Sequence, residues 1–462
     1  QITVPATPTT FNGQTVFYVA RFQQQSLAGA NGSLVPVIHS EFETQSFELN
    51  DTIKWQNWTF NAGLMVSNDQ FFGQGLREVS GNVSGFALAP GHKYKMYEVD
   101  WADTLSPRLG ATWAYDPNGT VYASLARYYP AANSLPRAAS WDRNLRSERQ
   151  AFFDVNGNLI GSQALAASSG KFFDDELDPR AVDEYILGTS RQINRQWSSR
   201  AYARYRYGYN FWEDTNNTAR QAFNPPDGIP RDLYIPNLAT VRAEIGGSSY
   251  VIAELDGAFT KFYEVSLETE RRTAKTFVRG SYVWSHYYGN FDQDNTTTAN
   301  DANAFIGSSF IADGEGRQLW QHRYGDLRGD RRHQLKLYGF YELPWHANVG
   351  GLAIYQSGQP WEKWDYSIYP AANIGTDTDD TSRFAEPAGH RTTDAHYQLD
   401  LNYTQDFPFL SRYNVQLRLD VFNVFDKQTG YNIQNKVHIA DFGKPRSFFE
   451  PRRLQVAIRF QM

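Results

Sequence analysis

Closely spaced carboxylates are the residues of this chain whose type and spacing most readily suggest chemistry. They lie in three predicted loops, at residues 377–380, 174–176 and 292–294. Carboxylates at such spacing are hard oxygen donors that suit Ca²⁺. None of the three clusters has EF-hand spacing, and a solvated acidic loop is the simpler interpretation of each. We therefore predict no metal site and no cofactor.

Catalytic motifs are absent from the sequence. It contains no GxSxG, HExxH, P-loop or GxGxxG pattern, and none of its nine histidines forms an HxH or HxxxH pair. A soluble carbohydrate-active enzyme would need two carboxylates at a defined separation, and the sequence does not place such a pair. We predict that the chain is not an enzyme and has no catalytic residues.

Aromatic side chains are the other candidates for ligand recognition. The chain has 28 Tyr, 31 Phe and 12 Trp, and many gather near predicted strand ends and in loops. Most suit the interfacial girdles of a membrane protein, while the remainder could line a ligand vestibule that faces the cell exterior. The vestibule candidates are Tyr209, Trp212, Trp284, Tyr288, Trp320, Trp361 and Trp364.

The elements that must position these residues are predicted to be β-strands. From Arg453 to Phe460, polar and apolar residues alternate without a break, which gives a strand one charged and one apolar face. A half-buried soluble sheet has this pattern, and so does the closing strand of an outer-membrane β-barrel. Similar alternation predicts about fourteen strands, at residues 14–22, 41–53, 56–68, 106–116, 119–128, 180–192, 196–212, 257–271, 274–288, 330–343, 347–357, 394–405, 412–425 and 450–461.

The connections between these strands alternate between short and long. Short ones include 116–118, 194–195, 272–273, 344–346 and 406–411. Outer-membrane barrels have short periplasmic turns and long extracellular loops, whereas a soluble sandwich or propeller has no reason to keep that order. The predicted extracellular segments are residues 23–40, 69–105, 129–179, 213–256, 289–329, 358–393 and 426–449.

The polar face of the strands carries many charges. Buried unpaired charges cost several kcal/mol each, so a dry core could not hold them, but a hydrated or plugged lumen could. We predict that the following residues face the lumen or a plug inside it: Arg204, Arg206, Arg279, Lys336, Asp400, Arg418 and Asp420.

Composition supports a barrel that crosses a membrane. Aromatic residues make up 15% of 462 residues, yet the mean hydropathy is −0.57 and no apolar run is long enough for a membrane-spanning helix. The absence of cysteine fits export through an oxidising periplasm. A net charge of −6 without a basic run argues against nucleic acid as a partner.

Several motifs, taken in order, resemble those of TonB-dependent outer-membrane transporters, particularly the Oar-like branch. The most specific is Tyr324-Gly325-Asp326-Leu327 followed by the segment 330–339, DRRHQLKLYG. Weaker matches are SPRLGAT at 106–112, YDPN at 115–118, LDP at 177–179, EYILG at 184–188, QSGQP at 356–360, DVFNVF at 420–425 and the segment 442–453.

The resemblance implies a barrel of about 22 strands with a globular plug in its lumen. The chain departs from that pattern, because it has about fourteen predicted strands and no recognisable plug or TonB box. We therefore expect residues 1–462 to be the C-terminal part of a barrel domain whose plug and first strands are missing. A second departure is Met462, where the family usually ends in an aromatic residue.

The resemblance further implies a location in the bacterial outer membrane and active uptake through a plugged pore. Implied partners are the TonB complex acting through a plug, outer-membrane lipid and lipopolysaccharide, the barrel assembly machinery and, through the loops, another outer-membrane or surface protein. Two alternatives are a self-closed passive channel and a surface-interaction barrel that acts through its long loops. The sequence does not identify the transported ligand.

Overall fold

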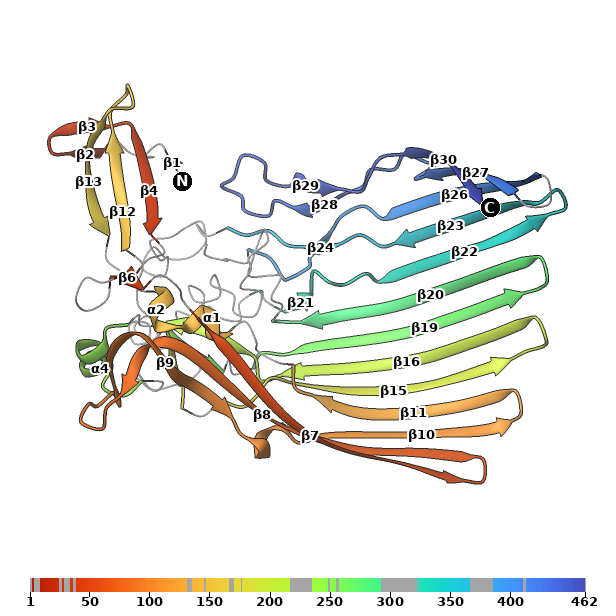
Figure 1. The fold of residues 1–462 in the computed structure, drawn as a ribbon, viewed down its shortest axis with the longest axis horizontal. Helices are drawn as coiled ribbons and strands as arrows, with labels where there is room; N and C mark the ends of the chain where they lie inside the picture. Colours follow the sequence, from red (N-terminus) through yellow and green to blue (C-terminus); the bar gives the residue numbers. More distant parts are fainter. Residues whose placement is uncertain are drawn as a thin grey trace.

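The computed structural model describes the whole chain except residues 1, 4–8, 25–26, 29–33, 36–38, 131–134, 145–146, 166–169, 176, 217–234, 248–249, 255–256, 292–321, 323, 366–384, 410–412 and 462. About half of the described residues belong to one large, curved, antiparallel sheet, as Figure 1 shows. The predicted all-β class is therefore confirmed.

Thirteen strands follow one another along this sheet and form what we call the wall. Each pairs with its neighbours in chain order, so the wall is an up-and-down arrangement. The strands are β7 (Glu41–Trp55), β8 (Trp58–Glu78), β10 (Ser106–Asp116), β11 (Gly119–Tyr128), β15 (Ala181–Gln192), β16 (Trp197–Tyr209), β19 (Thr260–Arg272), β20 (Thr276–Gly289), β22 (His333–Leu343), β23 (Ala347–Gln356), β26 (His396–Phe409), β27 (Tyr413–Phe422) and β30 (Arg453–Gln461).

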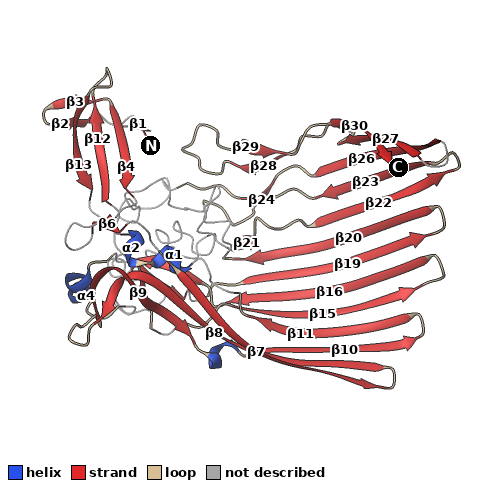
Figure 2. Cartoon of the chain, in the orientation of Figure 1, coloured by secondary structure: helices blue, strands red, loops and turns tan. Residues whose placement is uncertain are grey.

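Short and long connections alternate along the wall as predicted. Two to four residues join β7 to β8, β10 to β11, β15 to β16, β19 to β20 and β22 to β23, all at one end of the wall (Figure 1). The turn between β26 and β27 lies outside the described residues. The described parts of the long segments, with the helices that Figure 2 draws, lie at the opposite end.

The first and last strands of the wall are not paired with each other. Within the described part of the chain, β7 pairs only with β8, and β30 pairs only with β27. Both strands therefore present unsatisfied backbone groups along one side, which an open sheet must cover or pair. The described strands do not form a self-closed barrel.

The predicted strand at 14–22 is not part of the wall, so the wall has thirteen strands rather than fourteen. Its residues form β3 (Gln14–Val16), which pairs with β2 (Thr9–Phe11), and β4 (Tyr18–Gln24). With β1 (Ile2–Thr3), β12 (Ser147–Phe153) and β13 (Leu159–Leu165), β4 forms a separate sheet beyond the loop end of the wall (Figure 1). Val16, Val19 and Phe152 form a small core there. Local alternation is the same in both sheets, so it could not decide which one the strand joins.

The sequence predicts a long connection at residues 69–105, but in the structure this segment forms most of a long strand pair. β8 has 21 residues and pairs with β9 (Phe86–Val99) beyond the level at which it pairs with β10. A membrane-crossing strand needs only about 9–11 residues, so the outer half of β8 extends beyond the rest of the wall. A short 3₁₀ helix, η1 (Trp101–Thr104), then leads into β10.

The outer halves of β8 and β9 carry a compact unit that we call the cap. It also contains α1 (Leu135–Ala139), α2 (Trp141–Asn144), α4 (Leu238–Ile245), β14 (Phe172–Phe173), β17 (Trp212–Asn216) and β18 (Tyr250–Glu254). Two adjoining apolar clusters form its core, one around Trp141 and Val251 and one around Phe71 and Ile252. Helix α4 ends at Gly246, whose φ of 71° is favourable only for glycine.

Smaller strand pairs occupy the other loops. They are β5 (Leu27–Ala28) with β6 (Leu34–Val35), β24 (Pro360–Trp361) with β25 (Arg391–Thr392), and β28 (Gly430–Ile433) with β29 (Pro445–Phe448), while β21 (Gly325–Asp326) extends the wall beside β20. None of the helices in the described residues is both long and apolar enough to cross a membrane.

Candidate functional site: the polar face of the wall and the loops above it

The register of the wall separates its side chains into two faces. Between β16 and β19, Ala203 lies opposite Val265 and Arg204 lies opposite Glu264. The same alternation continues to β30, where Ile458 lies opposite Leu417 and Arg459 opposite Gln416. Large apolar side chains on the first face are exposed, up to 73% for Phe460. The wall therefore has a continuous apolar face and a continuous polar face.

All seven charged residues predicted to face a lumen or plug lie on the polar face. Residues directly opposite each other on neighbouring strands point to the same face. On this face Arg204 lies opposite Glu264, Arg279 opposite Tyr338, Lys336 opposite Ser281, and Asp420 opposite Asn402. The same parity holds for Arg206, Asp400 and Arg418. Whether they contact a plug remains a prediction.

Ion pairs occupy the centre of the polar face. Arg204 lies between two buried carboxylates, 3.1 Å from Glu264 and 3.5 Å from Glu184. Arg206 donates a hydrogen bond to Glu184, and the Tyr202 hydroxyl donates to Glu264 at 2.6 Å. Charge-assisted hydrogen bonds of this kind offset the cost of removing carboxylates from water. The predicted cations were identified from the sequence, whereas Glu184 was not.

The remaining charged side chains of the polar face have different partners: an ion pair, a backbone N–H or solvent. Arg418 pairs with Asp420 at 2.8 Å, and Arg279 pairs with Glu268 at 2.8 Å. Asp400 accepts a hydrogen bond from the backbone N–H of Asn423 at 2.7 Å. Lys336 makes no ion pair within the described part of the chain, so its ammonium is open to solvent or to another polypeptide.

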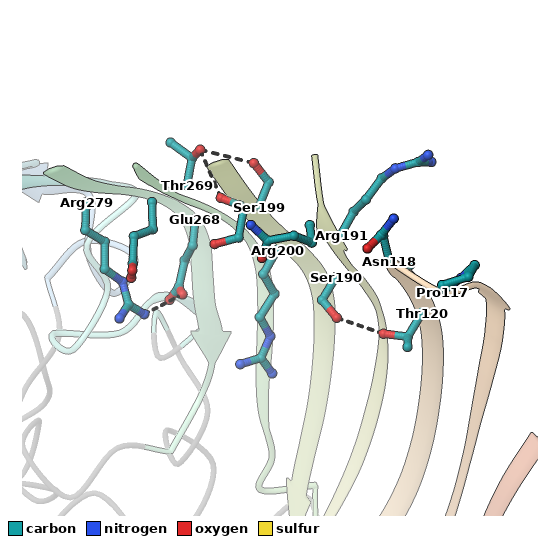
Figure 3. A pocket seen from close by; sticks show the side chains of 14 residues that line it. Pro117, Asn118, Thr120, Ser190, Arg191, Ser199, Arg200, Glu268, Thr269 and Arg279 are labelled. Carbon is teal, nitrogen blue, oxygen red and sulfur yellow. Dashed lines mark hydrogen bonds and ion pairs between the residues drawn. The ribbon is translucent and has the colours of Figure 1, made fainter. Parts of the chain in front are cut away.

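A polar pocket of about 420 Å³ lies where the wall strands approach their short turns (Figure 3). Thr120 and Ser190 share a hydrogen bond of 2.7 Å at one side, and Glu268 and Arg279 pair at the other. Arg200 donates to the Tyr122 hydroxyl at 2.9 Å. The pocket offers hydroxyls and paired charges, which suit contact with a polar polypeptide better than reaction chemistry.

Three of the aromatic vestibule candidates lie on wall strands, on the apolar face. Trp284 pairs in register with Val265, and Tyr288 pairs with Lys261. Tyr209 stacks on Tyr207, and its hydroxyl donates to Asp183 at 3.4 Å. The register therefore does not direct these three side chains toward the polar face.

The other vestibule candidates lie in the cap and the loops. Trp212 is buried in the cap, where its indole N–H donates to the Asp178 carbonyl at 2.6 Å. Trp361 is half-buried, with the Arg391 guanidinium 5.2 Å from its ring. Trp364 is buried, and Trp320 lies outside the described residues. The six described candidates are thus divided between the apolar face of the wall, the cap core and the loops, and the role of all seven in ligand binding remains a prediction.

Trp364 belongs to a buried ion-pair cluster that the sequence did not reveal, which we call the rim cluster (Arg328, Glu362, Trp364 and Asn435). Glu362 is 0% exposed and accepts hydrogen bonds from the Trp364 indole at 2.7 Å and from Arg328 at 3.3 Å. The Trp364 backbone N–H donates to the Asn435 carbonyl at 2.9 Å. Three separate loops are thereby joined at the outer end of the wall. The nearest signal in the sequence is the motif formed by residues 324–327 and 330–339, because Arg328 lies between its two parts.

The acidic clusters lie mostly beyond what the structure describes. Residues 377–380, 292–294 and Glu176 are outside the described part, while Asp174 and Asp175 lie beside the cap. Among the described residues, no group of three or more His, Asp or Glu side chains is placed to hold a metal ion.

Comparison with known proteins shows what the chain is similar to. Residues 5–171 match the model of the family described as TonB dependent receptor-like, beta-barrel. The chain is 22% identical over 380 residues to the TonB-dependent transporter Oar of Myxococcus xanthus, which covers 74% of this chain and 33% of that protein. The chain thus spans about a third of the length of that relative.

Two solved structures share the fold. The outer membrane transporter YddB from Escherichia coli has a TM-score of 0.52 and 12% identity, and the match covers 91% of this chain and 54% of that one. FpvAI, in its complex with pyocin S2, has a TM-score of 0.50 and 13% identity, with 92% and 40% of the two chains covered. The resemblance indicated by the motifs is confirmed, and the family that it indicates consists of outer-membrane receptors and transporters rather than enzymes.

Proposed function

We propose that this TonB-dependent receptor-type barrel of the bacterial outer membrane forms part of an active transporter for a ligand still to be identified. A plug would lie against the polar face of the wall, and the TonB complex would act on that plug. The observation that carries the proposal is the wall itself: thirteen antiparallel strands with one exposed apolar face and one polar face whose central charges are paired.

The polar face suits contact with a folded plug. Its central carboxylates already have partners, so a plug could pack there without leaving charges uncompensated. The exposed Lys336 ammonium can donate further hydrogen bonds, and so can the pocket hydroxyls near the short turns, each of which can take more than one partner. In this arrangement the wall does no chemistry, since it supplies a rigid frame and polar contacts.

A self-closed passive channel is less well supported. A channel made from this wall alone would need β7 and β30 to pair, and they do not pair in the described structure. A surface-interaction barrel would act through the cap and the loops, where function is commonly carried, but no observation favours it over a transporter.

The test uses the receptor in its native membrane and in purified form. Cells with the gene, without it, and without TonB are grown in the same medium, and the depletion of small molecules from the medium is compared. We expect at least one component to be depleted only when both the gene and TonB are present. Purified protein in planar bilayers should carry no steady ion current. Steady current, together with uptake that does not require TonB, would favour the passive channel.

A further inference from the structure

A groove of about 580 Å³ lies on the apolar face of the wall and runs from its middle toward the short turns. Leu267 on β19, Tyr282 on β20 and Leu335 on β22 lie opposite one another in one row along it. Gly280 leaves the next row open, since a Cβ added there would first meet the side chain of Leu337, at 3.5 Å. The groove is therefore a hollow in the face of the wall that borders lipid.

Arg191 borders the groove at the end nearest the short turns. Figure 3 shows the side chains of Arg191 and Thr269 on one side of the sheet and that of Arg200 on the other. Arg191 forms an ion pair with Asp116 at 3.3 Å, but its side chain remains 55% exposed. Because a guanidinium has five N–H donors, Arg191 can bind a further anion while it keeps this ion pair.

Arg271 supplies a second guanidinium on the same face. It lies opposite Trp197, one row closer to the turns than the end of the groove, with its guanidinium 5.8 Å from the Trp197 ring. Arg271 makes no ion pair in the described part of the chain, and residues 181–209 and 260–289 around it are all described. Only β16 separates its strand from that of Arg191, a distance of about 10 Å, so the two guanidinium groups can reach one headgroup.

The surroundings of the two arginines are positively charged, although the whole chain has a net charge of −6. Residues 191–197 and 270–276 contain five basic residues and one acidic residue, and the neighbouring acids Asp116 and Glu342 leave the basic residues in excess. The charged residues behind the groove, on the polar face, do not reverse this balance, since three are basic and one is acidic: Arg200, Arg279, Lys336 and Glu268. This end of the wall therefore attracts an anion.

Exposed tryptophans lie at the level of these charges. Trp197 at the start of β16 is 37% exposed, and Trp345 in the turn between β22 and β23 is 55% exposed. Indole rings favour the boundary between hydrocarbon and headgroups, where one part of the ring meets lipid and the N–H meets water. The guanidinium groups of Arg191 and Arg271 thus lie at the depth of lipid phosphates, and the groove extends from there into the hydrocarbon.

We propose that this groove, which we call the turn-side groove, binds one anionic phospholipid of the leaflet on the side of the short turns. An acyl chain would lie along Leu267, Tyr282 and Leu335, and the phosphate would lie beside Arg191 and Arg271. Close packing favours the chain, and charge-assisted hydrogen bonds from guanidinium groups favour the phosphate. The inference goes beyond the proposed transport function, because it rests only on the apolar face lying in a membrane and needs neither a plug nor TonB.

Two phospholipids with identical acyl chains test the proposal by native mass spectrometry of the purified, delipidated receptor. Phosphatidylglycerol carries a net negative charge, whereas phosphatidylethanolamine does not. We expect the first phosphatidylglycerol to bind about fivefold more tightly than phosphatidylethanolamine, because basic residues at the headgroup level favour the charged lipid. Inorganic phosphate at the same concentration should not displace it, since phosphate cannot occupy the apolar part of the groove.

Arg271 and Arg272 provide a matched pair of variants, because adjacent residues of a strand point to opposite faces. Arg271→Gln removes a guanidinium from the groove and should abolish most of the preference for phosphatidylglycerol. Arg272→Gln removes the same charge from the polar face, where Arg272 pairs with Glu270 at 3.5 Å, and should leave the preference unchanged.

Gly280→Phe tests the apolar part of the groove without changing any charge. The ring would fill the hollow beside Leu337, so both phospholipids should bind more weakly and by the same factor. Heat-modifiable gel mobility shows whether each variant is folded.

The proposal is overturned if the unmodified receptor binds both phospholipids equally, or if inorganic phosphate displaces phosphatidylglycerol. It also fails if Arg272→Gln has the same effect as Arg271→Gln, or if folded Gly280→Phe binds both lipids normally. Lipid-free dimers that resist phosphatidylglycerol would assign the groove to a second copy of the chain instead. None of these results depends on uptake in the TonB experiment, so the two proposals can fail separately.

Discussion

The wall and the cap are built from the same kind of alternating sequence, but they treat apolar side chains in opposite ways. On the wall, Leu187 is 60% exposed, and many other large apolar residues of that face are exposed as well. In the cap, Trp141 and Val251 are fully enclosed by neighbouring elements. The difference follows from the solvent, because lipid surrounds the apolar face of a barrel whereas water surrounds an external unit. Exposing an apolar side chain is therefore favourable on the lipid-facing wall and unfavourable in the cap, which faces water.

The largest effect is expected where the cap core is removed. Trp141→Ala deletes a side chain that packs on Phe172 with ring centres 5.0 Å apart and donates to the Ile245 carbonyl. The change should destabilise the cap by about 3–5 kcal/mol. Limited proteolysis should show rapid cleavage within residues 67–99 and 235–254, while the heat-modifiable gel mobility of the wall stays unchanged. Simultaneous loss of both readouts would mean that wall and cap fold as one unit.

A charge placed on an equally exposed apolar residue should separate the two regions. Leu187 on the wall is 60% exposed, and Val83 at the β8–β9 turn is 61% exposed. Leu187→Arg should cost about 2–4 kcal/mol, because the guanidinium would face hydrocarbon. Val83→Arg should change stability by less than about 0.5 kcal/mol, because it faces water. The midpoint temperatures of wall and cap unfolding in lipid measure the two effects. Equal effects would contradict the assignment of the apolar face to lipid.

How far the sequence predicts each region follows from the range of the interactions involved. The wall was predictable because a period of two decides the face of every side chain, which is why Arg204 and Arg418 were assigned to the polar face correctly. The strand at 14–22 was misplaced, because alternation does not say which neighbour a strand pairs with. Its partner, β12, is more than 120 residues away along the chain.

The cap and the loops were less predictable, since their contacts are non-local. Residue type makes Trp212 and Trp364 candidates for ligand contact. Each is in fact enclosed, and each gives its indole N–H to a distant or buried acceptor, Asp178 or Glu362. Residue type alone cannot distinguish a tryptophan whose indole is available to a ligand from one whose indole N–H already donates a hydrogen bond inside the protein.

Removing one central cation of the polar face should have an intermediate effect. In Arg204→Met, Glu264 would keep the Tyr202 hydroxyl and Glu184 would keep Arg206, so the loss should be about 1–3 kcal/mol. Lys336→Met is the matched control, because it removes the same charge from the same face where no ion pair exists in the described structure. Gel-mobility midpoints in urea compare the two, and an equal loss would show that the pairing of Arg204 contributes nothing.

The smallest effect concerns a carboxylate in the cap that lacks full compensation. Asp142 is buried; one oxygen accepts from the Gly91 N–H at 2.6 Å, and the other has no hydrogen bond in the described structure. Burial raises the pKa of Asp142 above its ordinary value of about 3.9. Between that ordinary value and the raised one, the folded cap binds more protons than the unfolded chain, so its stability falls as the pH rises.

Asp142→Asn keeps the shape of the side chain and removes this titration. The variant should therefore lose the decline in cap stability through the weakly acidic range and gain about 1 kcal/mol at neutral pH. Protease-resistance midpoints of the cap, measured as a function of pH, give the slope, with exposed Asp103→Asn as the control. The wall offers an internal reference, because its heat-modifiable mobility should not change in either variant. If cap stability still falls with rising pH in Asp142→Asn, another group causes the pH dependence, and the prediction for Asp142 is wrong.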